Sequence, residues 1–249
     1  MKIIADLHAH TLVSNHAFNT ITEMAKQAAE LGHFALAITD HGPLMPDSPH
    51  PWYFYNITTL PRKMEGVWVL KGIEANVCDV KGTLDFDESK FEELDLDWVV
   101  ASIHPDTLPG PLTQDQATEL WINVANNPRV DMIGHSESRF YAYDYDAVTK
   151  IFAQKKKVVE LNANSRVARP GNEVNMRDLA LACKKNDVPV AINSDAHSIY
   201  HLGQVDTIFE MLQEIHFPNE LIVNTSEEKL KRMLAQHHKK VLEYMEELK

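Results

Sequence analysis

The chain has 249 residues, of which 44% are apolar, enough for one large α/β domain with a sizeable core. Glycine and proline are not enriched, which excludes a collagen-like or disordered chain. The formal net charge of −12 argues against nucleic acid or an anionic membrane as a partner, because both require lysine and arginine patches. A small anionic substrate stays compatible with this charge if divalent cations bind it.

We expect a cytoplasmic protein from the cysteine content, the N-terminal sequence and the lengths of the apolar segments. Cys78 and Cys183 are far apart and form no CxxC pattern, so we expect free thiols rather than a disulfide, as in a reducing cytosol. The N-terminal apolar run is interrupted by Asp6 and is too short for a signal peptide. No segment approaches the roughly 18–20 apolar residues of a membrane span.

Strand-like runs alternate with helix-like segments along the chain. In chain order we expect a strand at residues 2–7, a helix at 22–31, a strand at 35–39, a proline-rich irregular loop at 43–61 and a strand at 67–75. A hairpin-like excursion at 76–85, turning at 81–82, precedes a strand at 98–103, a helix at 113–126 and a strand at 130–134. A helix at 146–154, a strand at 157–161, a polar loop at 162–174, a helix at 176–186 and a strand at 188–193 follow. The last segments are a helix at 205–215, a short apolar run at 221–223 and an amphipathic helix from residue 226.

These segments make seven βα units without a break in composition, so we expect a single domain over residues 1–249. Parallel strands need helical crossovers, which leaves a barrel or a wound sheet. Residues of metal-ligand type follow nearly every strand, and an open sheet would spread them too far apart to meet. The pattern therefore predicts an α/β barrel whose site lies at the C-terminal ends of the strands.

Nine residues of metal-ligand type recur along the chain, nearly all where an apolar run ends: His8, His10, His16, His41, Glu74, His104, His135, Asp195 and His197. His16 lies six residues after His10, in a loop that can curl back. His8 and His10 are two residues apart, so both rings can project to one side of a strand. A carboxylate such as Glu74 is costly at the end of an apolar strand unless it is paired or metal-bound.

Imidazole with carboxylate favours Zn, Mn, Fe or Ni over Mg or Ca. At three or four ligands per ion, with carboxylate sharing, the nine residues divide among three ions. The other histidines lack this setting, and we expect four of them to face solvent: His33, His216, His237 and His238.

Four stretches resemble motifs of the PHP (polymerase and histidinol phosphatase) family, and most of all its YcdX-like phosphatase branch. They are Asp6-Leu7-His8-Ala9-His10-Thr11, Thr39-Asp40-His41-Gly42-Pro43, Gly72-Ile73-Glu74-Ala75-Asn76 and Ser194-Asp195-Ala196-His197. The resemblance runs over essentially the whole chain. It implies a distorted (βα)7 TIM-like barrel with a trinuclear metal centre, often of zinc.

The resemblance also implies how the ligands are grouped. One ion would lie on His8, His10, Glu74 and Asp195, a second on Glu74, His104 and His135, and a third on His16, His41 and His197. The chain departs from the branch pattern at Ser136-Glu137-Ser138, where His-Pro-Gly is usual, at Pro105-Asp106, where Glu-Pro is usual, and in detail at residues 164–169. These departures lie beside the ligands and bear on substrate preference.

The function expected from these residues is hydrolysis of a small phosphomonoester by a metal-activated hydroxide at a trinuclear, zinc-type centre. We expect Asp40 to orient a ligand imidazole and Arg62, Arg166 or Arg169 to grip phosphate. The C-terminal helix is expected to pack on its own barrel, with a homo-oligomer contact as the alternative.

Three other functions stay open. Histidinol-phosphate phosphatase would use the same chemistry with a different pocket. A metal-dependent amidohydrolase also carries H-x-H on its first strand and a late aspartate, but its binuclear centre would leave His16, His41 and His197 without a role. A non-catalytic or proofreading module of the kind attached to DNA polymerases is disfavoured because no polymerase region is present and the chain is acidic.

Overall fold

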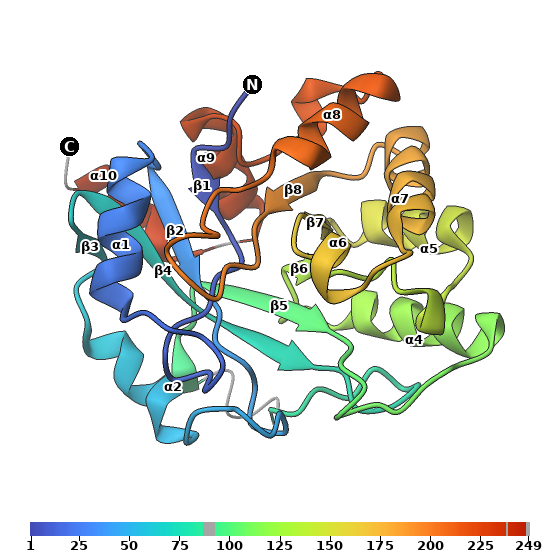
Figure 1. Cartoon of the computed structure of the whole chain (residues 1–249), viewed down its shortest axis with the longest axis horizontal. Coiled ribbons are helices and arrows are strands. Elements are labelled where there is room, and N and C mark those ends of the chain that lie inside the picture. Colours follow the sequence, from blue (N-terminus) through green and yellow to red (C-terminus); the bar gives the residue numbers. More distant parts are fainter. Residues whose placement is uncertain (87–92, 238, 248–249) are drawn as a thin grey trace.

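Seven parallel strands follow one another around a nearly closed barrel in the computed structural model, which describes residues 1–86, 93–237 and 239–247 (Figure 1). They are β1 (Ala5–Asp6), β2 (Ala35–Ile38), β4 (Val67–Asn76), β5 (Trp98–Ser102), β6 (Met132–Ile133), β7 (Val158–Asn162) and β8 (Val190–Asn193). A short β3 (Lys63–Met64) pairs antiparallel with the start of β4. The predicted seven-stranded α/β barrel is confirmed.

The first and last strands meet through local contacts rather than a continuous ladder. A bridge between Ala9 and Ala196 joins them just past their C-terminal ends. Below it, the buried Asn224 side chain donates to the carbonyls of Ala5 (2.8 Å) and Ile192 (2.7 Å). The chain just after the short apolar run predicted at 221–223 therefore fills the gap between β1 and β8, and both strands can still deliver residues to one rim.

The main helices are α1 (Ile21–Glu30), α4 (Gln114–Asn126), α5 (Tyr145–Gln154), α7 (Glu173–Lys185), α8 (Asp206–Glu214), α9 (Glu227–Gln236) and α10 (Val241–Glu247). Figure 1 shows α1 on one side of the strands and α4, α5 and α7 on the other. Thr20 caps α1 by accepting from the Glu23 N–H, and Gly32 follows its end at φ +73°. No helix in the described ranges is both long and apolar enough to cross a bilayer.

The C-terminal helices pack against the strands at the end of the barrel away from the site. Leu230 and Leu234 of α9 and Val241 of α10 share one buried cluster with Trp98 and Met132 of the strands. This confirms that the segment after residue 226 packs on its own barrel. It forms two helices rather than one, because the chain leaves α9 at His237, whose ring donates to the buried Asp131 carboxylate (2.9 Å).

The main departures from the predicted elements are short helices in the expected loops. The loop at 43–61 contains α2 (Trp52–Asn56) and a 3-10 turn (Ile57–Thr59), and the loop at 162–174 contains α6 (Ser165–Ala168). The helix α2 has one buried residue, Phe54, and α6 has one, Ser165. Both helices are too short for their sequences to show a helical period.

Of the four histidines expected at the surface, His216 is exposed, whereas His33 is buried and the His237 ring is mostly covered. His238 lies outside the described residues.

Candidate metal centre

The rim of the barrel brings the seven predicted imidazoles into one cluster. Ring centroids are 4.2 to 5.2 Å apart along the order His16, His197, His10, His41, His104 and His135, and His8 lies 5.1 Å from His10. These rings come from segments that follow β1, β2, β5, β6 and β8, and they converge because parallel strands end on the same face.

Glu74 of β4 lies at the centre of this cluster. Five imidazole Nε2 atoms surround its carboxylate: His135 (2.9 Å), His8 (3.3 Å) and His104 (3.6 Å) face Oε1, and His41 (3.1 Å) and His10 (3.5 Å) face Oε2. Burial alone would raise the pKa of Glu74, but the imidazoles of His8 and His104 reverse this and hold the pKa well below its ordinary value. Glu74 is therefore an ionised carboxylate with imidazoles on both of its oxygens.

Asp195 supplies the second central carboxylate. Its Oδ1 lies 3.1 Å from the His10 Nε2 and 3.6 Å from the His8 Nε2. Asp195 and His135 both adopt positive φ, 51° and 24°, a region that L-residues rarely occupy. Backbone strain at two ligand positions is common where a site over-determines its geometry.

Five of the seven rings are held from behind at Nδ1. His8 faces Glu160 (2.8 Å), His104 faces the Asn76 side-chain oxygen (2.7 Å), and His197 faces the Asp195 carbonyl (3.0 Å). His16 (2.7 Å) and His41 (3.0 Å) both face the carboxylate of Asp47. An acceptor at Nδ1 keeps the proton there and turns Nε2 towards the centre, which is how outer groups orient metal-binding histidines.

The sequence analysis did not single out Glu160, Asn76 or Asp47. The sequence could have pointed to Glu160 and Asn76, because each is a polar residue close to the end of an apolar strand, like Glu74, and both are buried. Asp47 lies in the irregular part of the proline-rich loop, where no periodic pattern marks it.

Unpartnered atoms show that the residues fit metal ions. The Nε2 atoms of His8, His10 and His197 and Oε2 of Glu74 are buried without a hydrogen-bond partner in the described chain. Buried polar atoms are partnered in the great majority of cases, so a group of unpartnered donor atoms that face one space fits the ligand set of a cation.

The donor sets are compact enough for such ions. His8, His10 and Glu74 offer three ligand atoms that all lie within 4.8 Å of one another. The same holds for His10, His41 and His197, and for His41, Glu74 and His104. His41 therefore lies at the border between groups rather than inside one.

The ring charges also suit ligation. Burial lowers the pKa of His104 to about 3 and lowers that of His10 well below its ordinary value, so both rings are neutral and can bind metal. Burial would also lower the pKa of His41, but Asp47 and Glu74 raise it to about 10, which shows that the space beside this ring attracts positive charge.

Asp40 does not hold a ring, contrary to the prediction. Its carboxylate accepts from the Thr11 N–H (2.7 Å), the Ser14 hydroxyl (2.8 Å) and the Tyr53 hydroxyl (2.6 Å). Asp40 therefore fastens the turn that follows His10, and the expected contact with an imidazole is made by Asp47 and Glu160 instead.

The three candidate arginines lie in different places. Arg169 lies on the rim, with Nη1 3.2 Å from the Ser165 hydroxyl and 4.0 Å from Asp195 Oδ2. Arg166 is exposed and lines a separate cavity of about 290 Å³ between α6, α7 and α8.

Arg62 lies away from the predicted ligands, contrary to the prediction that it grips phosphate. It pairs with Asp97, which directly precedes β5, so it lies at the end of the barrel opposite the ligands. The five residues of β5 separate the two ends by roughly 17 Å at ~3.3 Å per residue.

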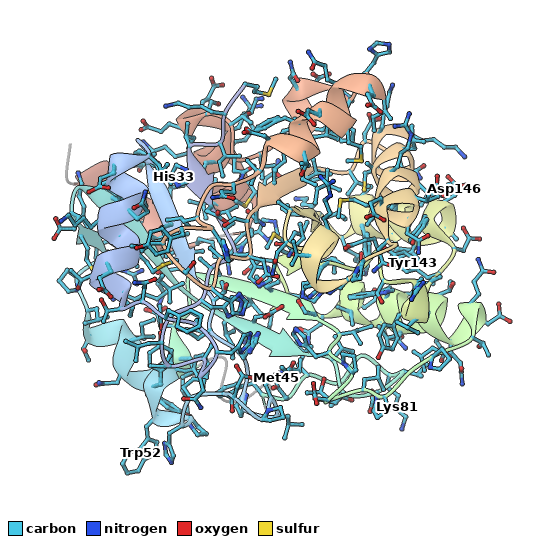
Figure 2. The ribbon with its side chains drawn as sticks, viewed as in Figure 1. His33, Met45, Trp52, Lys81, Tyr143 and Asp146 are labelled. Carbon is cyan, nitrogen blue, oxygen red and sulfur yellow. The ribbon has the colours of Figure 1, made fainter. Side chains whose placement is uncertain are left out.

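The aromatic residues of α2 contribute little to the rim. Figure 2 shows Trp52 at the outer edge of the molecule, away from the strands, and its side chain is 75% exposed. Phe54 is buried in the core, and Tyr53 reaches inward only to bond Asp40. The α2 segment is therefore mainly a packed anchor for the loop.

A family model described as "PHP domain" matches residues 6–164. The chain belongs to the PHP domain family. A "Probable phosphatase" of Clostridium novyi (strain NT) is 43% identical over 232 residues, covering 92% of this chain and 93% of that protein. A "Probable phosphatase" of Acetivibrio thermocellus is 39% identical over 241 residues, covering 97% and 99%.

A solved structure shares the fold of this PHP domain. The histidinol phosphate phosphatase of Lactococcus lactis, complexed with zinc, L-histidinol and phosphate, gives a TM-score of 0.59 at 17% identity. The match covers 86% of this chain and 94% of that one. The predicted family and the predicted barrel are both confirmed.

Proposed function

We propose that this PHP domain is a metal-dependent phosphatase that hydrolyses a small phosphomonoester at a centre of three divalent ions, with zinc as the first candidate. The observation that carries the proposal is the cluster of imidazoles around the Glu74 and Asp195 carboxylates, in which the buried Nε2 atoms of His8, His10 and His197 have no hydrogen-bond partner among the described residues. The probable-phosphatase relatives support phosphate esters as the substrate class.

The ligand groups follow the family pattern. His8, His10, Glu74 and Asp195 would hold the first ion, Glu74, His104 and His135 the second, and His16, His41 and His197 the third. Divalent ions bound there would supply Lewis-acid charge and lower the pKa of a coordinated water from 15.7 to about 7.

The remaining residues orient the ligand imidazoles or bind the phosphate. Glu160, Asn76 and Asp47 keep the ring protons on Nδ1 and so keep the inner nitrogens available. Arg169 stands at the rim with part of its guanidinium free of close partners among the described residues, and we assign it the phosphate oxygens. Arg166 faces a different cavity and is not part of this assignment.

The support behind His16, His41 and His197 favours a three-ion phosphatase over an amidohydrolase. His16 and His41 are both fixed by Asp47, and His197 by the Asp195 carbonyl. Histidines that served no ion would not require this support.

The test combines metal content with turnover on one sample. Elemental analysis should give about three transition-metal ions per chain, and hydrolysis of an aryl phosphate should be lost with a chelator and restored by zinc. A panel that includes histidinol phosphate, an amide and a lactone would then define the substrate. Two or fewer ions, together with amide or lactone hydrolysis and no phosphatase activity, would refute the proposal.

A further inference from the structure

One carboxylate, that of Asp47, serves two imidazoles of the centre at once. Oδ2 of Asp47 lies 2.7 Å from the His16 Nδ1 and 3.0 Å from the His41 Nδ1, and Oδ1 lies 3.1 Å from the same His41 nitrogen. Both rings belong to the group of His16, His41 and His197, which we name the third subsite. Two of its three imidazoles therefore depend on a single acceptor.

The anchors of the other subsites are built differently. Glu160 lies on β7 and Asn76 on β4; both are fully buried, and each holds one ring of the cluster at Nδ1. The Asp47 side chain is 18% exposed and lies on the loop after β2, outside the strands, and the His16 side chain is 55% exposed. The acceptor of His16 and His41 in the third subsite is thus a partly exposed loop residue, not a buried strand residue.

Asp47 also ties its loop to the segment that carries His16. Its carbonyl accepts from the Asn15 N–H (3.0 Å), while its side chain holds the neighbouring ring. Further along the same loop, the Tyr53 hydroxyl donates to Asp40 (2.6 Å), which in turn fixes the turn at Ser14. The loop is therefore attached at Asp47 and again at Tyr53.

We propose that Asp47 is a positioning residue that sets how tightly the third subsite holds its ion, so that the chain passes between three-ion and two-ion forms as free metal falls. This inference rests on the proposed three-ion phosphatase. Without the carboxylate, each ring can move its proton to Nε2, where an imidazole cannot bind metal. Losing one outer acceptor costs about 10- to 100-fold in metal affinity, and full removal of this one takes the support from two ligands, so we expect about 100-fold or more for full removal.

The substitution Asp47→Asn tests this with little change in shape. An amide oxygen at the place of Oδ2 still reaches both rings, but it is a weaker acceptor than a carboxylate, and the NH₂ at the place of Oδ1 opposes the His41 N–H. Asp106→Asn is the matched control, because Asp106 is also an exposed rim aspartate, two residues after His104, and has no partner among the described residues. Each protein is dialysed against buffers of graded free zinc, and zinc per chain is measured by elemental analysis.

We expect wild type and D106N to hold three ions down to the same free zinc concentration. D47N should fall to two ions at about 10- to 100-fold higher free zinc, with the two tighter ions unchanged. Three ions in D47N with wild-type affinity, or loss of all three ions together from a folded D47N, would overturn the inference. If D47N does not fold by circular dichroism, Asp47→Ser removes the same acceptor with a smaller side chain and is read in the same way.

The wild-type result separates the two proposals. Fewer than three ions in wild type at every zinc concentration would refute the three-ion function itself. Three ions in wild type and an unchanged D47N would refute only the role of Asp47.

Discussion

Glu160 is the most connected group behind the metal centre, and Glu160→Gln is the sharpest test of how the centre is built. The buried carboxylate accepts four hydrogen bonds, two at each oxygen. Oε1 accepts from the His8 ring (2.8 Å) and the Asn193 amide (2.9 Å), and Oε2 from the His135 N–H (2.9 Å) and the Asn162 amide (3.1 Å). A glutamine keeps the shape but turns one of these oxygens into a donor.

The neighbouring amides cannot rotate to relieve this conflict. The Asn193 oxygen already accepts from the Leu7 N–H (2.9 Å), and the Asn162 oxygen from the Ser165 N–H (3.1 Å). A flip of either amide would leave a buried backbone N–H without its acceptor. The His8 ring can respond by moving its proton to Nε2 and accepting from the glutamine NH₂. In that orientation the Asn193 amide is the buried donor that loses its partner, at about 1–3 kcal/mol.

We therefore expect E160Q to lower the free energy of unfolding of the metal-free protein by about 1–3 kcal/mol, measured by urea denaturation in excess chelator. Glu137→Gln is the matched control, because Glu137 is equally buried but neither of its oxygens has a partner in the described chain. The substitution at Glu137 breaks no hydrogen bond, so stability should stay the same or rise. An E160Q protein within about 0.5 kcal/mol of wild type, or an equal loss in E137Q, would show that the hydrogen-bond network does not act as argued.

Three further predictions follow from the geometry. Glu74→Gln should cost more than the ~100-fold activity loss typical of an outer-group change, because it alters a carboxylate shared by five imidazoles, and metal analysis should show fewer ions. Arg169→Ala should raise KM for an aryl phosphate about 10- to 100-fold through loss of a charged hydrogen bond. Arg62→Ala should leave the kinetics unchanged and lower the free energy of unfolding by about 3 kcal/mol, because it leaves the Asp97 carboxylate without its cation. Equal effects of the two substitutions on KM would contradict the assignment of Arg169 to phosphate. Burial lowers the pKa of His33 to about 4, so between pH 6.5 and 4 the unfolded chain binds the extra proton and stability falls as pH falls, by up to about 3 kcal/mol. His33→Gln should flatten this slope in urea titrations, and an unchanged slope would show that the ring titrates normally.

The ligand set was predictable because it depends only on strand ends. Each ligand follows an apolar run, and parallel strands of a barrel end on one face whatever the details of packing. His8 and His10 needed only the two-residue repeat of a strand to be placed side by side. Glu74 stood out as a charge inside an otherwise apolar segment, which physical chemistry allows only with partners.

The groups that orient the ligands were harder to predict because they depend on loop paths. Asp47 reaches His16 and His41 only because the loop after β2 folds back over them, and no periodicity records that path. Arg62 was misplaced for the same reason: the two-residue strand β3 pairs with the start of β4 and draws the arginine to the opposite end of the barrel. His33 was expected at the surface because a lone histidine after a helix carries no sign of burial.

The charge balance of the centre bears on how many ions it holds. Four carboxylates contact its imidazoles, namely Glu74, Asp195, Glu160 and Asp47. Two divalent ions would only neutralise these four negative charges, which would leave Arg169 as the positive group assigned to a phosphate dianion. Three divalent ions leave two positive charges, which match the two negative charges of a phosphomonoester, and a bound ion is the largest local charge in such a site. The carboxylate count therefore favours three ions for a phosphate ester, whereas a two-ion centre with the same residues would suit a neutral substrate such as an amide.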